Sequence, residues 1–387
     1  MAGYIFIYIK MKFSELNLIT PILSALERKG YQEPTPIQQK SIPHVLAGRD
    51  VFGCAQTGTG KTAAFAIPLL QLIAGKKNTS EKKLKTLILA PTRELAMQIS
   101  ENIETYSANL DIRHATVFGG ISQVSQVNAL KRGVDVLIAT PGRMLDLMQQ
   151  GYINLHHIEY FVLDEADKML DMGFINDIRK ILAKMPLRRQ TLFFSATASK
   201  EIMSLAGTLL NNPVHVSVTP VSSTTALVKQ HLYFVKKENK RLLLKHVLTN
   251  KDMEHVLVFT RTKRGADKVA KELNKHGIKA EAIHGNKSQN ARTRTLAGFK
   301  NKSIRVLVAT DIASRGIDID KLSHVINYEL PEQCETYVHR IGRTGRAGNP
   351  GTAISFCSHD EKAFLNDISK LIKKDLEVIK SHPFTEN

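Results

Sequence analysis

Residues 55–62, with the sequence AQTGTGKT, restrict the fold of this chain more than any other segment. They follow a short apolar run and precede a stretch that is typical of a helix. A glycine-rich turn between a strand and a helix presents successive backbone N–H groups and the positive end of the helix dipole, and both attract phosphate. We therefore predict a phosphate loop, in which Lys61 reaches the outer phosphates of a nucleotide and the Thr62 hydroxyl holds Mg²⁺. Gly usually begins this pattern and Ala55 stands there instead, so an ordinary strand–helix turn is the alternative.

Short apolar runs alternate with helical stretches on both sides of a polar, turn-rich segment, 211–228. Such near-continuous apolar strands, separated by helices, are typical of a parallel sheet that is covered on both faces. The length of 387 residues also favours two domains. We expect an α/β protein with two domains joined by a short linker at 211–228. The predicted strands are 86–89, 115–118, 134–138, 160–163, 191–194, 256–259, 280–283, 306–309, 325–328 and 353–356.

Charge and cysteine usage restrict the partners and the compartment. The net charge of +18 at pH 7 favours a polyanionic partner. Cys54, Cys334 and Cys357 have neither paired nor metal-ligand spacing, which is typical of thiols in a reducing compartment. No apolar run approaches the length of a membrane span. We expect a cytoplasmic protein without membrane contact, in which residues 1–11 form an extension outside the folded part.

Two acids, Asp164 and Glu165, directly follow the apolar strand 160–163. Functional groups in open α/β sheets lie at the carboxyl ends of strands. Asp164 could hold Mg²⁺ together with Thr62, and Glu165 could orient a water molecule for attack on the γ-phosphate. An acidic helix cap is the alternative for Asp164. The hydroxyls of Ser195 and Thr197, after another strand, could cap a helix or could link these acids to a part that moves on hydrolysis.

The segment 339–346, HRIGRTGR, carries three arginines at a spacing of three, interrupted by glycines. The planar guanidinium group suits phosphoryl oxygens, and an arginine supplied to the transition state accelerates phosphoryl transfer strongly. We predict that Arg343 and Arg346 reach the γ-phosphate of a nucleotide bound by the first domain. A plain contact to nucleic acid is the alternative.

Ten segments in one order resemble the motif series of DEAD-box RNA helicases. The resemblance covers residues 12–375, and the wording around 30–38 and 55–70 is most similar to the bacterial RhlE-type branch. It implies two RecA-like domains, 12–210 and 229–375, followed by a short tail at 376–387. Ala55 is the residue that this family usually has at that position. The segments are 30–38, 55–62, 91–95, 119–120, 140–143, 164–167, 195–197, 289–292, 309–318 and 339–346.

The resemblance also implies a role for individual residues of an ATP–Mg²⁺ site. Gln38 would read the adenine edge, and Phe13 would stack near the ring. Mg²⁺ would be held by Thr62 and Asp164, partly through water. The remaining nucleotide-binding positions would be Ala55, Gln56, Thr57, Gly58, Thr59, Gly60, Lys61 and Asp318, and the catalytic positions Lys61, Asp164, Glu165, Arg343 and Arg346.

Two further sets of residues follow from the resemblance. RNA would be gripped along its sugar–phosphate backbone, so binding should depend on salt and little on sequence. Hydrolysis would be coupled to domain closure. The RNA-binding set is Arg93, Gly120, Thr140, Arg143, Arg261, Gln289, Arg292 and Thr310, and the coupling set is Asp167, Ser195, Thr197 and His339.

The expected function is that of an ATP-dependent RNA helicase, whose RNA-stimulated ATP hydrolysis drives local, non-processive unwinding of short duplexes or remodelling of RNA–protein complexes. An ATP-gated RNA clamp with little unwinding is the alternative, because its motifs would be identical. A DNA translocase is a second alternative, against which the segment 34–38 argues. We expect a monomer with ATP and Mg²⁺ as cofactors, RNA as the main partner, and protein partners in RNA decay or ribosome assembly.

Overall fold

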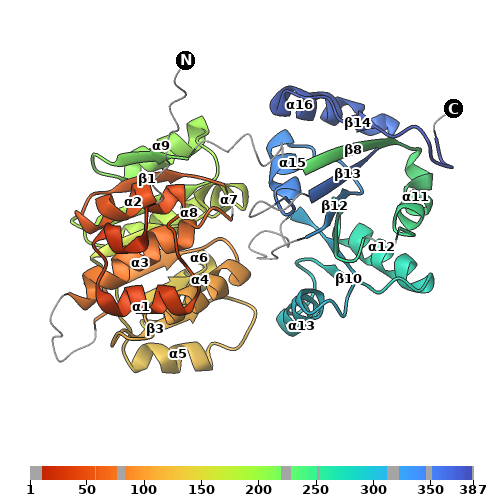
Figure 1. Cartoon of the computed structure of the whole chain (residues 1–387). Coiled ribbons are helices and arrows are strands. Elements are labelled where there is room, and N and C mark those ends of the chain that lie inside the picture. The colour runs from red at the N-terminus through yellow and green to blue at the C-terminus, as the bar shows by residue number, and fades with distance from the viewer. Residues whose placement is uncertain are drawn as a thin grey trace, which may run out of the picture. The chain divides into compact units, whose positions relative to one another are not determined.

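The computed structural model describes residues 11–56, 58–75, 83–218, 228–250, 253–311, 322–345 and 351–385. Contacts divide the chain into two compact units, Met1–Thr219 and Pro220–Asn387. Each unit has its own seven-stranded sheet with helices on both faces (Figure 1). The expected extension, apart from Met11, lies outside the described residues, as do residues 219–227 of the expected linker. Residues 214–217 of that linker instead form a strand in the sheet of unit 1.

The sheet of unit 1 is parallel throughout its described pairs, in the order β3-β4-β2-β5-β6-β1-β7. Most of its strands are four-residue apolar runs, buried because helices cover both faces of the sheet. Its strands are β1 (Val51–Cys54), β2 (Thr86–Leu89), β3 (His114–Val117), β4 (Val136–Ala139), β5 (Tyr160–Leu163), β6 (Gln190–Ser195) and β7 (Val214–Ser217).

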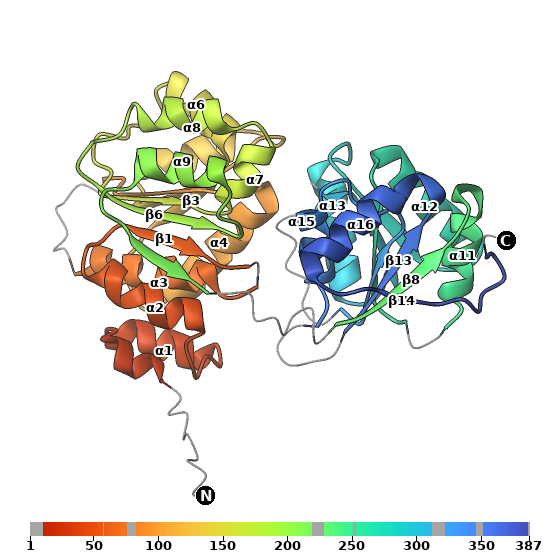
Figure 2. The ribbon, with the colours of Figure 1, turned by 90° about the horizontal axis from the view of Figure 1, so that it is seen from above.

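Alternate residues of these strands face two separate cores. Val162 and Phe194 belong to one hydrophobic cluster, whereas Phe161 and Phe193 belong to the other. Figure 2 shows the sheet between the two helical layers. The first layer is η1 (Phe13–Leu16), α1 (Thr20–Arg28), α2 (Pro36–Leu46), α3 (Lys61–Ala74) and α4 (Arg93–Tyr106), and the second is α5 (Val124–Lys131), α6 (Pro141–Gln149), α7 (Ala166–Asp171), α8 (Ile175–Leu182) and α9 (Lys200–Leu209).

Unit 2 has the same architecture, with the strand order β10-β11-β9-β12-β13-β8-β14 and parallel pairing throughout the described pairs. Helices α11 (Lys240–Val247) and α12 (Lys263–Lys275) cover one face. Helices α13 (Gln289–Lys300), α15 (Cys334–Ile341) and α16 (Lys362–Ile372) cover the other. The strands are β8 (Val228–Phe234), β9 (Val256–Phe259), β10 (Ala280–Ile283), β11 (Val306–Ala309), β12 (His324–Asn327), β13 (Gly351–Cys357) and β14 (Glu377–Val378), and the short helices are η2 (Lys237–Asn239) and η3 (His359–Glu361).

The segment expected as a short tail packs against unit 2. Its strand β14 pairs with β8, and the backbone N–H of Ile379 donates to the carbonyl of Leu232 at 2.8 Å. Leu376 is buried, and Phe384 packs against the core under α11. None of the helices in the described ranges is long and apolar enough to span a bilayer.

The fold class predicted from the sequence is confirmed: both units have a parallel sheet with helices on each face. In such a sheet the carboxyl ends of the strands meet at one edge, which is where ligands bind. Ligand-binding residues are therefore expected in the loops after β1, β5 and β6 in unit 1, and after β9, β11 and β12 in unit 2.

Candidate functional site

The phosphate loop joins β1 to α3 and curls because two of its glycines adopt left-handed backbone angles. Gly58 has φ +82° and Gly60 has φ +91°, which suit a residue without a Cβ atom. The Lys61 side chain is buried and its Nζ donates to the carbonyl of Ala55 at 2.5 Å, so it closes the loop on itself. Thr59 Oγ1 donates to the carbonyl of Gln56 at 2.7 Å. Thr57 lies outside the described residues.

Ala55 fits this loop without a glycine. Its methyl group is buried in the core under α3, and its N–H donates to the carbonyl of Ser195 at 3.0 Å. Its φ is not positive, so the position does not need the freedom of Gly. The departure from the usual pattern therefore has a packing reason.

Gln38 contacts the loop through its amide. Helix α2 begins at Pro36, and the Oε1 of Gln38 accepts from the N–H of Thr35 at 2.9 Å, completing a capping box. Its Nε2 donates to the carbonyl of Gly60 at 3.1 Å. A Cβ atom on Gly60 would lie 2.3 Å from that nitrogen, so Gly60 is also required for this close approach. Phe13 is buried in the same core, with its ring centroid 6.5 Å from that of Tyr31.

The acids after β5 are almost fully buried. Asp164 and Glu165 are each 2% exposed, and Glu165 adopts φ +54°, an uncommon angle for a non-glycine residue. The Oε1 of Glu165 lies 2.6 Å from the Nζ of Lys168. Burial and the neighbouring Glu165 raise the pKa of Asp164 to about 7, although Lys61 and Lys168 act in the opposite direction. Because the charged form of Asp164 is disfavoured in this buried site, a cation bound beside it would stabilise the carboxylate.

The geometry of the strands fits Mg²⁺ that is shared with phosphate oxygens. Strands β1 and β5 are separated only by β6, so they lie roughly 10 Å apart in the sheet. Thr62 follows the loop after β1, and Asp164 directly follows β5, so both belong to the same edge of the sheet. Within the described part of the chain, no group of three His, Cys, Asp or Glu side chains could hold a metal alone. Mg²⁺ usually keeps several waters and binds through one or two protein oxygens plus substrate phosphates. The residues present therefore fit ATP–Mg²⁺, for which Thr62 and Asp164 are the protein ligands that the sequence predicts.

Three of the four residues expected to couple hydrolysis to motion lie together at the end of β6. The Oδ2 of Asp167 accepts from the N–H of Ala196 at 3.3 Å, and the N–H of Thr197 donates to the Oγ of Ser195 at the same distance. The acidic segment and the Ser195–Thr197 turn are thus bonded to each other. His339 lies on α15, in unit 2.

The RNA-binding residues expected in unit 1 converge on the loop after β3. The guanidinium of Arg93 lies against Gly120, where a Cβ atom would come within 2.1 Å of its Nη1. Arg143 Nη2 donates to the carbonyl of Ile121, in the same loop, at 3.2 Å. Thr140 begins α6 beside them, and its N–H donates to the carbonyl of Val117 at 3.0 Å. The structure brings all four together because β2, β3 and β4 are neighbours.

In unit 2, Arg261 is held by acids. Its guanidinium lies 3.2 Å from Glu361 and 4.0 Å from Glu329, and its N–H donates to the carboxylate of Glu329 at 2.8 Å. The other expected RNA contacts lie at neighbouring strand ends: Gln289 and Arg292 open α13, and Thr310 follows β11 with its N–H bonded to the carbonyl of Ile283.

The arginines of 339–346 have different surroundings. Arg340 is 1% exposed and binds both carboxylate oxygens of Asp311, at 2.6 and 2.8 Å. It also donates to Asn327 and to the carbonyl of Glu329, so it ties α15 to the ends of two strands. Arg343 is 5% exposed, while Arg346 and Asp318 lie outside the described residues.

Sequence reasoning assigned no role to Arg340, Asp311 or Glu361. Glu361 is fully buried and accepts hydrogen bonds from Lys240, Arg261, Leu330 and Ser358. A signal for the burial of Arg340 is its place on the same face of α15 as Tyr337 and Ile341, which are also buried. No local pattern announces Glu361, since two of its partners lie more than 90 positions away.

Two family models match the chain: the DEAD/DEAH box helicase model over residues 35–205 and the helicase conserved C-terminal domain model over residues 239–348. The chain is 44% identical to "DEAD-box ATP-dependent RNA helicase CshA" of Streptococcus pneumoniae, over 96% of this chain and 70% of that protein. It is also 44% identical to the CshA of Geobacillus kaustophilus, over 95% of this chain and 78% of that protein.

A solved structure of Saccharomyces cerevisiae Dbp5 bound to RNA and ADP BeF3 matches with a TM-score of 0.84 and 29% identity, covering 95% of each chain. The family assignment is supported by the order of the motifs, by the two parallel sheets and by the extent of these matches. The protein belongs to the DEAD/DEAH box helicase family.

Proposed function

We propose that this protein is an ATP-dependent RNA helicase that hydrolyses ATP in response to RNA and separates short RNA duplexes locally. The observation that carries this proposal is the buried acid pair Asp164–Glu165 at the same sheet edge as a glycine-rich loop closed by Lys61. A buried carboxylate with a raised pKa is suited to a bound cation, and Glu165 stands next to it to orient water. Relatives that carry the RNA helicase name support the substrate.

The proposal assigns specific roles to the residues of both units. Lys61, Thr62 and Asp164 would hold the phosphates and Mg²⁺, and Glu165 would position the attacking water. Arg343 and Arg346 would stabilise the charge of the transition state, which is a usual task of arginine in phosphoryl transfer. The two RNA-binding sets would contact the RNA backbone. The proposed domains, 12–210 and 229–375, would also include β7 and β14, which pair within the sheets of units 1 and 2.

We also propose a branch of the family, a cellular compartment and a class of protein partners. The relatives reported above carry the name CshA, which favours that branch over the RhlE-type branch expected from the wording of the motifs. We place the protein in the cytoplasm, because its three cysteines are free thiols. The monomer is kept as the expected state. Protein partners in RNA decay or ribosome assembly remain part of the proposal.

The test is a pair of measurements on the full chain with ATP, Mg²⁺ and a short RNA duplex that has a single-stranded extension. One follows the release of a labelled strand, and the other follows the residence time of the protein on single-stranded RNA. Strand release that requires ATP hydrolysis is the expected result. Long residence without release would instead support the ATP-gated clamp. Equal stimulation of ATP hydrolysis by DNA would contradict the choice of RNA.

A further inference from the structure

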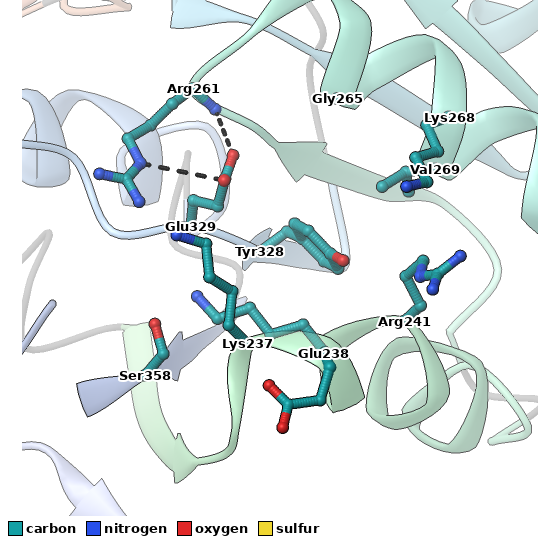
Figure 3. A pocket seen from close by; sticks show the side chains of 11 residues that line it. Lys237, Glu238, Arg241, Arg261, Gly265, Lys268, Val269, Tyr328, Glu329 and Ser358 are labelled. Atoms are coloured by element: carbon teal, nitrogen blue, oxygen red, sulfur yellow. Dashed lines mark hydrogen bonds and ion pairs between the residues drawn. The ribbon is translucent and has the colours of Figure 1, made fainter. Parts of the chain in front are cut away.

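Unit 2 contains a groove at the carboxyl edge of its sheet, between the N-terminal parts of α11 and α12 (Figure 3). Its volume is about 400 Å³. We call it the β9–β12 groove, because Arg261, after β9, and Tyr328, after β12, are among its lining residues. The groove is lined by Lys237, Glu238, Lys240, Arg241, Arg261, Gly265, Lys268, Val269, Tyr328, Glu329 and Ser358.

The groove lies where the strand order of unit 2 reverses. Strands β10 and β11 lie on one side of β9, and β12, β13 and β8 lie on the other. In open parallel sheets, ligands bind in the crevice outside the carboxyl ends of the strands at this switch point. The β9–β12 groove therefore occupies the position at which a ligand of unit 2 is expected.

Three of the five cations in the lining are already compensated. Lys240 pairs with the fully buried Glu361, which also binds Arg261 at 3.2 Å. Lys237 pairs with Asp360 at 3.0 Å. These pairs fix the walls of the groove and leave little charge for a ligand.

The other two cations keep their charge. Across the described ranges, neither Arg241 nor Lys268 forms an ion pair within 4.0 Å or a side-chain hydrogen bond. One acid that acts on Arg241 is Glu272 on α12, whose pKa is lowered mainly by Lys275 and to a lesser extent by Arg241. Both side chains are exposed, one on α11 and the other on α12. Of the two acids in the lining, Glu329 is bound by Arg261, and Figure 3 shows the carboxylate of Glu238 pointing away from the Tyr328 hydroxyl.

Tyr328 adds a neutral donor to the same groove. Burial raises the pKa of its hydroxyl well above the usual value, so the group stays protonated at neutral pH and can donate. Figure 3 shows this hydroxyl on the side of the ring that faces Arg241 and Lys268. A guanidinium, an ammonium and a hydroxyl form a donor set that suits the oxygens of a phosphate group.

We propose that the β9–β12 groove binds a phosphate group through Arg241, Lys268 and the hydroxyl of Tyr328. One source of this phosphate is the backbone of an RNA strand that runs past Arg261, and this source rests on the proposed function. The other source is a small phosphorylated molecule, which does not depend on the proposed function. The same three donors serve both sources.

The experiment compares two charge-matched double variants of the full chain. Arg241→Glu/Lys268→Glu reverses the two uncompensated cations of the groove. Lys245→Glu/Lys271→Glu makes the same change of charge on the same two helices outside the lining. Tyr328→Phe removes one hydroxyl without a change of charge. Thermal unfolding of each variant checks that the fold is intact.

One arm titrates inorganic pyrophosphate into the protein by calorimetry, with the nucleotide site blocked by the Lys61→Ala substitution in every variant. The other arm measures the salt dependence of binding to a short and to a long single-stranded RNA. A small phosphorylated ligand predicts pyrophosphate binding that is weakened roughly tenfold or more in the groove variant and kept in the control. If the phosphate belongs to an RNA backbone, the slope of log binding constant against log salt concentration should fall in the groove variant by about one for each lost contact. This change should occur with the long strand only.

Unchanged results in both arms, or equal losses in the groove variant and the control, would overturn the proposal. The pyrophosphate arm needs neither RNA nor ATP hydrolysis, and RNA-stimulated hydrolysis is measured separately on the wild type. A failure of the groove is therefore distinguishable from a failure of the helicase proposal.

Discussion

The amide of Gln38 is bonded to the phosphate loop: its Nε2 donates to the carbonyl of Gly60 at 3.1 Å. The oxygen of the same amide caps α2 through the N–H of Thr35. Because Gln38 is 4% exposed, neither bond is replaced cheaply by water. The Gln38 side chain therefore joins the start of α2 to the loop that would hold the phosphates.

The Gln38→Ala substitution should weaken nucleotide binding, and the pattern of the loss tells which role Gln38 has. If it reads the adenine edge, affinity for ATP should fall while affinity for GTP stays, so the preference disappears. If it holds the loop, both affinities should fall together, by about tenfold for the loss of one buried hydrogen bond. Equilibrium titration with labelled ATP and GTP measures both.

Gln39 provides the matched control for this substitution. It is the next residue on α2, and its Nε2 donates to the carbonyl of Pro34 at 2.8 Å, away from the loop. Gln39→Ala should leave nucleotide affinity unchanged. Unaltered ATP and GTP binding by Gln38→Ala would contradict both roles.

The buried pair between Lys168 and Glu165 should be costly to break on one side. Their charged atoms lie 2.6 Å apart, and both side chains are almost fully buried. Lys168→Met would leave Glu165 without its cation, which should lower the free energy of unfolding by roughly 3–5 kcal/mol. Chemical denaturation measures this change.

The double substitution Glu165→Gln/Lys168→Met removes both charges and should recover much of that loss, because no uncompensated ion then remains buried. A single Lys168→Met variant as stable as the wild type would show that the pair carries no such constraint.

The buried carboxyl of Asp164 should make the stability of the nucleotide-free protein depend on pH. Its folded-state pKa is about 7, against 3.8 for the free side chain. Between these values the folded state binds a proton that the unfolded state does not, so stability rises as pH falls through this window and is lost as pH rises toward 7. The charged groups that act on Asp164 are Glu165, Lys61 and Lys168, and all three are unchanged in the variant described next.

Asp164→Asn removes this proton, and the variant should lose less stability than the wild type as the pH is raised from about 5 to about 8. Thermal unfolding at a series of pH values provides the comparison. Equal pH dependence of the two proteins would be evidence against the raised pKa.

Local patterns predicted the parts of the molecule that are built locally. The turn at 55–62, the acids after β5 and the alternation of strands and helices all depend on residues that are close in sequence. Arg340, Arg343 and Arg346 follow one another at the same spacing, and nothing near Arg340 in the sequence indicates that Asp311, 29 positions away, pairs with it. The acids around Arg261 come from two distant segments, one with Glu329 and Glu332 and the other with Glu361. The RNA contact expected for Arg261 therefore came without any sign of what holds its side chain.

RNA-stimulated ATP hydrolysis by the wild type and by Glu165→Gln tests whether Glu165 orients the attacking water. The variant should still bind ATP and RNA but lose turnover by at least about 100-fold, because it lacks this carboxylate. Glu101→Gln removes an exposed carboxylate of the same unit and should hydrolyse ATP like the wild type. Turnover by Glu165→Gln at the rate of the wild type, or a wild type whose hydrolysis does not respond to RNA, would contradict the account.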